Sequence, residues 1–209
     1  MKSVSEPARK IEIREANQAL ILEAAERVFA VHGYKGATTE QIAHEAGLPK
    51  ANVHYYFKTK ANIYRQVLKH ILDEWMAAAA TFDAEHEPEQ ALRTYIAAKM
   101  AFSRQRPYGS KVWASEIMSG APVMEKFLGT TLKSWLHERE RIIRGWIRDG
   151  KIKPVDPHAL LFLIWACTQH YADFERQIVI LNGGKEMTDQ QYLERTNQLI
   201  DLILHSVGL

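Results

Sequence analysis

Apolar residues recur at a spacing of three and four along almost the whole 209-residue chain, and this helical period limits the fold more than any other feature. The first clear stretch covers residues 14–32 and stops before Gly33, a residue type that commonly ends a helix. We find no convincing strand pattern, in which apolar and polar residues would alternate. The sequence therefore predicts an all-α fold of about nine helices.

Two short helices are predicted after this first one. Thr38 and Gln41 have the spacing of a capping box, which starts a segment that ends at Gly47. Pro49 suits the first position of a following helix over residues 50–57. Two short helices joined by a tight glycine-containing turn indicate a helix-turn-helix motif, whose second helix lies in the major groove of DNA.

Further helices follow this motif. Thr59 is placed to cap a long one that reaches about residue 80. The others are expected over residues 88–106, 112–118, 123–148, 156–180 and from Thr188, which forms a second capping box with Gln191. Residues 159–167 are apolar at every position, and a helix that is apolar all round must be buried all round. We therefore expect a homodimer through the last two helices, with burial inside one chain as the alternative.

Positive charge is concentrated in one window of the chain. The 27 residues between Glu45 and Asp73 contain five Lys and Arg and no Asp or Glu, although the net charge of the whole chain is only +2. A concentrated positive field suits a polyanion-binding face, and a solvated basic surface is the alternative.

Several classes of protein are disfavoured by the sequence. The single cysteine, Cys167, excludes an internal disulfide and favours a reducing, cytoplasmic setting. The longest apolar run is residues 159–167, far short of a transmembrane helix, and the first 18 residues contain no signal-peptide core. Metal-binding histidine pairs, nucleophile motifs and phosphate-binding glycine loops are not found. We expect no catalytic residue, no metal and no cofactor; a small helical enzyme is a remote alternative.

The helix-turn-helix residues resemble those of a known family. Residues 39–48, Thr-Glu-Gln-Ile-Ala-His-Glu-Ala-Gly-Leu, and residues 55–60, Tyr-Tyr-Phe-Lys-Thr-Lys, resemble the DNA-binding region of the TetR family of bacterial repressors in order and spacing. The resemblance implies an all-helical homodimer in which the first three helices bind DNA and the remaining helices form a ligand pocket and a dimerising bundle. Pro49 departs from the more usual serine, and His54 to Phe57 vary the common Tyr-Tyr-His-Phe, so the preferred operator is open.

The expected domains are a flexible N-terminal arm (residues 1–13), a helix-turn-helix domain (14–59) and a ligand-binding and dimerisation domain (60–209). The residues expected to read bases from the recognition helix are Lys50, Asn52 and His54, because Lys reaches guanine acceptors and Asn pairs with adenine. Thr38 and Thr39 start the preceding helix and suit a phosphate. The resemblance implies further phosphate contacts for Tyr55 and Lys60, whereas Tyr56 and Phe57 are expected in the core.

The C-terminal part resembles a narrower subgroup, the RutR-like pyrimidine-responsive regulators, over residues 66–75, 118–122 and 164–174. The residues expected around an effector are Trp75, Tyr95, Lys99, Phe102, Trp113, Trp165, Gln169 and Tyr171. Aromatic walls, an amide and an ammonium suit a planar ligand with carbonyl and N–H edges, such as uracil or thymine. Ordinary core packing of these aromatic residues is the alternative.

Together these features predict a ligand-responsive transcriptional regulator, expected to act as a repressor. It would bind a palindromic double-stranded DNA operator as a homodimer and be released when a small-molecule effector tilts the long helix that begins at Thr59. A TetR-type regulator of another catabolic or efflux pathway, with an amino-acid, polyamine, fatty-acid or drug effector, is the alternative. We expect no association with a membrane.

Overall fold

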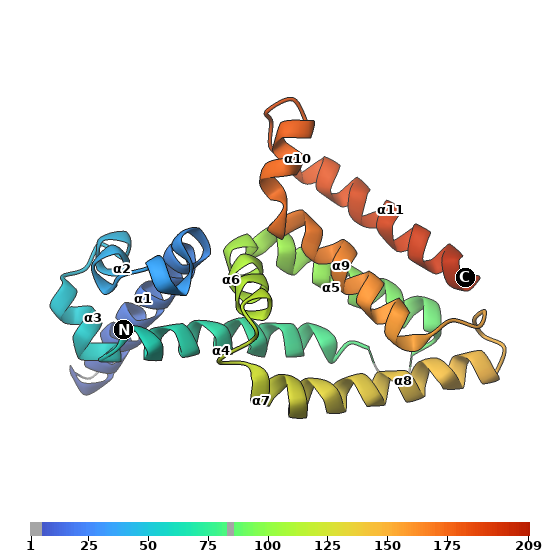
Figure 1. The fold of residues 1–209 in the computed structure, drawn as a ribbon, viewed down its shortest axis with the longest axis horizontal. Helices are drawn as coiled ribbons and strands as arrows, with labels where there is room; N and C mark the ends of the chain where they lie inside the picture. Colours follow the sequence, from blue (N-terminus) through green and yellow to red (C-terminus); the bar gives the residue numbers. More distant parts are fainter. Residues whose placement is uncertain (1–5, 83–85) are drawn as a thin grey trace, which may run out of the picture.

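The computed structural model describes residues 6–82 and 86–209, and every regular element within these ranges is a helix, as expected. In chain order the elements are α1 (Glu6–Gly36), α2 (Thr39–Glu45), α3 (Lys50–Phe57), α4 (Lys60–Ala79), α5 (Pro88–Gln105), α6 (Pro107–Met118), α7 (Glu125–Phe127), the π-helical turn η1 (Leu128–Leu132), α8 (Lys133–Arg148), α9 (Pro157–Asp173), α10 (Glu175–Leu181) and α11 (Asp189–Val207). Helices α1–α3 lie at one end of the molecule, and α4 runs from them toward the C-terminal helices (Figure 1).

The ends of the N-terminal helices follow the predicted signals. The Thr38 hydroxyl accepts a hydrogen bond from the Gln41 backbone N–H at 3.1 Å, and the Gln41 side chain accepts one from the Thr38 N–H at 2.8 Å, so the predicted capping box is confirmed. Gly33 has a φ of +65°, which interrupts the helical conformation at the predicted stop. Pro49 is the N-cap of α3 and not its first helical residue.

Helix α1 begins earlier than the sequence analysis expects. Of the expected flexible arm, residues 1–5 lie outside the described residues, but residues 6–13 are helical and continuous with α1. Residues 6–13 are therefore not the flexible arm that was expected. Their sequence explains the helix, because Pro7 suits a first helical turn and the following Ala, Arg and Lys have high helix propensity.

Two hydrophobic clusters hold the helices together. The first joins α1–α3 to the first half of α4 and to α6, and its buried members include Phe29, Ile42, Val53, Phe57, Ile63, Leu68 and Val112. The second lies among α5, α8, α9 and α11 and includes Leu92, Ile96, Ile143, Ile164 and Ile203. Helix α4 contributes Ile71 to the first cluster and Ala79 to the second, so packing is continuous across the boundary expected at residue 59.

Two predicted helices are interrupted. The helix expected over residues 123–148 contains the π-helical turn η1, whose Leu-Gly-Thr-Thr-Leu sequence combines a glycine with two β-branched residues of low helix propensity. The helix expected over residues 156–180 breaks at Phe174, which has φ −111° and ψ 24°. In residues 6–82 and 86–209, no helix is both long and apolar enough to cross a lipid bilayer.

Candidate functional site

Helix α3 presents polar and aromatic side chains to solvent. Its exposed or half-buried side chains include those of Lys50, Asn52, His54 and Tyr55. Val53 and Phe57 are buried and fix the opposite side of the helix to the first cluster. The Lys50 ammonium lies 3.3 Å from the Glu40 carboxylate of α2, and such an exposed pair contributes little to stability. The predicted base-reading residues therefore share one short helix, and Lys50 and His54 are accessible on it.

The two adjacent tyrosines of α3 have different surroundings. Tyr55 is 75% exposed, and its ring packs edge-on against Tyr56 at 5.1 Å between centroids. The Tyr56 hydroxyl accepts a hydrogen bond from the Asn17 amide of α1 at 3.2 Å. Tyr56 therefore ties α3 to α1, and Tyr55 remains available for an external partner.

The ammonium of Lys60 is occupied within the protein. It donates to the carbonyl oxygens of Tyr34 at 2.7 Å and Ala37 at 2.8 Å, lies 3.4 Å from that of Lys35, and stands 4.7 Å from the Tyr34 ring centroid. An ammonium has three N–H donors, and here three carbonyl oxygens surround it. Lys60 thus stabilises the connection between α1 and α2, and its expected phosphate contact stays a prediction.

The two threonines at the start of α2 also differ. The Thr38 hydroxyl serves the capping box and is exposed, whereas Thr39, the first residue of the helix, is half-buried. Thr38 consequently fixes where α2 begins, and a direct contact of either residue with phosphate stays a prediction.

A cavity of about 80 Å³ lies between α4, α5, α8 and α9. Six of the eight residues expected around an effector line it, namely Trp75, Tyr95, Lys99, Trp113, Trp165 and Gln169. Trp165 and Gln169 lie four residues apart on α9, and both reach the cavity, as their spacing implies. The Trp165 indole N–H donates to the Tyr95 hydroxyl at 2.7 Å, which holds two of the walls together.

Lys99 is a buried charge in this cavity. Its side chain belongs to the buried part of α5, and its ammonium lies 4.0 Å from the centroid of the Trp75 ring. Burial lowers the pKa of Lys99 to about 7, although the carboxylate of Asp173 opposes this shift. Near neutral pH the ammonium is thus close to losing its proton, and a ligand that accepts a hydrogen bond or carries negative charge favours the protonated form.

Two further hydrogen-bond donors at the cavity have no partner. The indole N–H groups of Trp75 and Trp135 are buried and make no hydrogen bond within the described part of the chain. A buried donor without an acceptor is costly, so each such group in a folded protein calls for an explanation.

Two of the residues expected around an effector do not line the cavity. Phe102 packs edge-on against the Trp75 ring at 5.7 Å and lies behind it. Tyr171 contacts the Tyr192 ring at 5.7 Å instead. The reason is helical geometry, because Tyr171 is two residues beyond Gln169 and so points about 200° around α9 from it.

Sequence reasoning missed several residues that line the cavity. They are Leu72, Met76, Ala79, Phe127, Leu132 and Trp135. Trp135, Ile143 and Trp146 lie on one buried face of α8, but Arg139 interrupts that apolar stripe. Arg139 is nevertheless buried, with its guanidinium 4.9 Å from the Trp135 ring centroid and a hydrogen bond to the Ala79 carbonyl at 3.3 Å. If the sequence pattern of a buried helix face is allowed to include an arginine that stacks on an aromatic ring, Trp135, Arg139, Ile143 and Trp146 form one such face, and Trp135 could have been predicted on it.

Comparison with protein families matches both parts of the chain. Residues 21–67 match the family described as bacterial regulatory proteins, tetR family, and residues 68–209 match the YcdC-like protein, C-terminal region. The chain belongs to the TetR family.

Relatives agree with the resemblance predicted from the sequence. This TetR-family chain is 38% identical over 189 residues to the HTH-type transcriptional regulator RutR of Escherichia coli, covering 90% of this chain and 89% of RutR. It is 33% identical to the transcriptional repressor NicS of Pseudomonas putida over 64% of this chain and 62% of NicS. The protein is therefore a ligand-responsive DNA-binding transcriptional regulator, and its family and relatives are regulators rather than enzymes.

Solved structures of TetR-family regulators have the same fold. The ketosteroid transcriptional regulator KstR2 of Mycobacterium tuberculosis superposes with a TM-score of 0.72 at 17% identity, over 91% of this chain and 94% of KstR2. The transcriptional regulator SCO4942 of Streptomyces coelicolor superposes with a TM-score of 0.68 at 22% identity, over 92% of this chain and 98% of that one. At these identities the likeness concerns the fold alone.

Proposed function

We propose that this regulator is a repressor that a small planar effector of the uracil or thymine type releases from DNA. The cavity carries the proposal: flat indole walls stack against a planar ring, and the side chains of Lys99 and Gln169 are donors for its carbonyl oxygens. The similarity to RutR, whose subgroup the sequence analysis describes as pyrimidine-responsive, supports the same effector class.

The cavity argues against two of the alternative effector classes. A polyamine is a polycation, and the buried ammonium of Lys99 would repel it in surroundings of low dielectric constant. A fatty acid would require a far larger expansion of this ≈ 80 Å³ cavity than a single pyrimidine ring would. A regulator of another pathway with an amino-acid or drug effector is the competing proposal, and the effector screen below separates the two.

For DNA recognition we propose that α3 lies in the major groove. Lys50, Asn52 and His54 would contact base edges, while Tyr55 and the start of α2 at Thr38 and Thr39 would contact phosphates and set the register. Because DNA lies in the bacterial cytoplasm, the protein would act there.

A homodimer through the last helices would present two copies of α3 to a palindromic operator. Helices α9 and α11 leave large apolar side chains partly exposed, namely those of Phe162, Leu163, Leu193 and Leu202. Exposed apolar side chains on these two helices favour a partner, and two-fold dimers are the commonest assembly. Successive major grooves on one side of DNA lie about 34–36 Å apart, and that spacing sets the required separation of the two α3 helices.

The size of the cavity suggests how an effector would release DNA. A cavity of about 150 Å³ can hold benzene, so one of ≈ 80 Å³ must expand to admit a pyrimidine ring. Helix α4 contributes Leu72, Trp75, Met76 and Ala79 to the wall, and it leads directly to α3. Expansion would therefore tilt α4 and change the separation of the two α3 helices.

The proposal is tested by selecting bound sequences from random duplex DNA with the purified protein at low salt. An enriched inverted repeat is the expected result and supplies an operator probe. Operator affinity is then measured without effector and with about 1 mM uracil, thymine, or each member of a panel of amino acids and drugs. We expect a pyrimidine to weaken operator binding at least about fivefold. Enrichment without any pyrimidine effect would leave a DNA-binding regulator with another effector.

Variants on α9 assign the effector to the cavity. Gln169→Leu removes the amide that lines it, and we expect uracil to bind at least about tenfold more weakly while operator affinity without uracil is kept. Tyr171→Phe is the matched control, because it removes a polar group from the same helix outside the cavity. Equal losses in the two variants would contradict an effector site in this cavity.

A further inference from the structure

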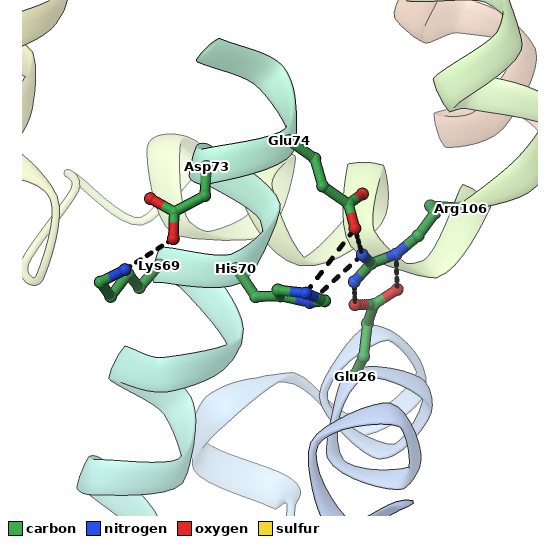
Figure 2. Close-up of polar contacts among 6 residues, drawn as sticks. All are labelled: Glu26, Lys69, His70, Asp73, Glu74 and Arg106. Carbon is green, nitrogen blue, oxygen red and sulfur yellow. Dashed lines mark hydrogen bonds and ion pairs between the residues drawn. The ribbon is translucent and has the colours of Figure 1, made fainter. Parts of the chain in front are cut away.

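One arginine connects three segments that are distant in the sequence. Arg106 lies at the corner between α5 and α6, and its guanidinium donates to the Glu26 carboxylate of α1 and to the Glu74 carboxylate of α4 (Figure 2). It also lies 3.3 Å from Nδ1 of His70 on α4. Backbone hydrogen bonds fix the corner itself, because the Arg106 N–H donates to the Phe102 carbonyl at 2.8 Å.

The two carboxylates that pair with Arg106 differ in their exposure to solvent. The Glu26 side chain is only 9% exposed, whereas that of Glu74 is 38% exposed. Burial works against the charge of the Arg106 guanidinium, but the hydrogen bonds and charges of Glu26 and Glu74 raise its pKa above the ordinary value. A buried carboxylate without a partner is strongly disfavoured, so α1 must keep Glu26 against Arg106. The more exposed contact with Glu74 is the one that can open.

The corner also packs tightly against both neighbouring helices. Gly109, in the first turn of α6, is buried, and a Cβ added there would lie 3.2 Å from the Glu26 carboxylate and 3.3 Å from Ile71 of α4. Because the packing leaves no free space, any movement of the corner displaces both α1 and α4.

The corner is connected to the effector cavity through two neighbouring residues. Trp75, a cavity residue, directly follows Glu74 on α4, and Phe102, which packs on Trp75, is one helical turn before Arg106 on α5. Displacement of the Trp75 ring by a ligand would change the position of Glu74 relative to the corner. The contact between Glu74 and Arg106 then has two arrangements, closed and open, while Arg106 stays on Glu26.

We propose that Arg106 is the positioning residue that couples the effector cavity to the DNA-reading helices, with Glu74 as its releasable partner and Glu26 as its fixed one. The inference rests on the proposed effector-controlled DNA release and assigns that control to named side chains. The Glu74 contact favours one orientation of α4 relative to α1–α3, and its opening allows the other.

The test compares Glu74→Gln with Asp73→Asn in the full-length protein. Glu74→Gln removes the negative charge but keeps the shape, and the Arg106–Glu26 pair remains. Asp73→Asn is the matched control, because Asp73 is the adjacent carboxylate and its pair with Lys69 at 2.6 Å is exposed and confined to α4 (Figure 2). For Glu74→Gln we expect uracil affinity by calorimetry to stay within about threefold of the wild type. Operator affinity without effector should fall, because the contact that favours the DNA-binding orientation of α4 is lost. Uracil should then weaken operator binding by less than about twofold, against at least about fivefold in the wild type and in Asp73→Asn.

A second measurement does not depend on uracil. Coupling between two sites is reciprocal, so operator DNA bound at α3 must change the cavity. Amide hydrogen exchange with and without the selected operator is expected to change in the α4 and α5 peptides around Trp75 and Phe102 in the wild type and in Asp73→Asn. In Glu74→Gln only α1–α3 should respond.

These outcomes separate the two proposals. If the wild type binds its operator but not uracil, the effector is wrong, and the exchange measurement still decides the role of Arg106. An operator-induced change around Trp75 that survives in Glu74→Gln would overturn the coupling inference even if uracil is the effector. A wild type that binds no DNA would overturn both, and it would be recognised because the control variant fails in the same way.

Discussion

At the scale of single residues, the molecule uses lysines in surroundings that the sequence does not reveal. Lys60 and Lys99 are both expected from the sequence to meet an external ligand. Within the protein, Lys60 faces main-chain carbonyl oxygens, and Lys99 lies over an indole ring. The sequence shows which residues carry a charge, but only the packed structure shows which groups each of them contacts.

The free energy of unfolding should depend on pH because Lys99 is buried. Its pKa is about 7 in the folded protein and near 10.5 in the unfolded chain, so between these values the unfolded chain binds one more proton. The cost of burying Lys99 is therefore fully present below pH 7 and fades as the pH rises toward 10.5. We expect Lys99→Met to be more stable than the wild type by roughly 1–4 kcal/mol near pH 6.5.

Urea unfolding at pH 6.5 and 9.5 measures this effect. The gain from Lys99→Met should shrink at the higher pH. Lys69→Met, which changes an exposed lysine of α4, should show no such trend. A gain from Lys99→Met that is equal at both values would mean that Lys99 does not change its charge in this range.

Lys60 distinguishes a positioning role from a phosphate contact. Lys60→Met removes its bonds to the Tyr34 and Ala37 carbonyl oxygens, and we expect a loss of about 1–3 kcal/mol of unfolding free energy. The slope of operator affinity against salt concentration separates the two roles, because an unchanged slope would leave Lys60 with the positioning role alone. A slope that falls by about one unit would instead establish the phosphate contact expected from the sequence.

At the scale of elements, the helix starts that carry a side-chain cap could be read from the sequence, and the interruptions could not. Thr38, Thr59, Asp156 and Thr188 each cap the helix that the sequence assigns to them, because a cap depends on residues only three positions apart. The π-helical turn η1 contains residues of low helix propensity, but such residues do not by themselves specify a π-helical turn. Likewise, six cavity residues followed from helical spacing, but the contribution of α8 through Trp135 required the packed structure.

The two capping boxes offer a matched pair of substitutions. Thr38→Ala and Thr188→Ala each remove a hydroxyl that accepts a backbone N–H bond, at 3.1 and 3.2 Å. Each should cost about 1 kcal/mol of unfolding free energy, measured by urea denaturation. Only Thr38→Ala should also weaken operator binding, since α2 supports α3. Unchanged operator affinity in Thr38→Ala would show that DNA binding tolerates fraying of α2.

At the scale of the whole molecule, α4 makes one folding unit of two functional parts. Its first half is buried with α1–α3, and its second half borders the cavity. The sequence predicts both parts from local signals. It gives no sign that they share a continuous core, because contacts such as that between α1 and α6 join residues far apart in the chain.

Assembly is the property to test at this scale. We expect light scattering to give twice the 24.0 kDa chain mass. The double variant Phe162→Glu, Leu202→Glu places charges on the exposed apolar surface of α9 and α11 and should give the mass of one chain. The same variant should lose most of its operator affinity, because each α3 would then bind one half-site alone.

Met118→Glu is the control for that variant. Met118 is 82% exposed in the last turn of α6 and belongs to neither α9 nor α11, so its replacement should leave the mass unchanged. A mass of one chain for the wild type at micromolar concentration would contradict the proposed dimer.

The distribution of tryptophan gives the molecule an optical property of its own. Of its five tryptophans, Trp75, Trp113, Trp135 and Trp165 line the cavity, and α1–α3 contain none. Indole fluorescence changes with local polarity and with nearby charge, and the Lys99 ammonium stands over one of these rings. The intrinsic fluorescence therefore reports mainly on the cavity. The binding of an effector can be followed by titration of this fluorescence, without a dye, a label or DNA.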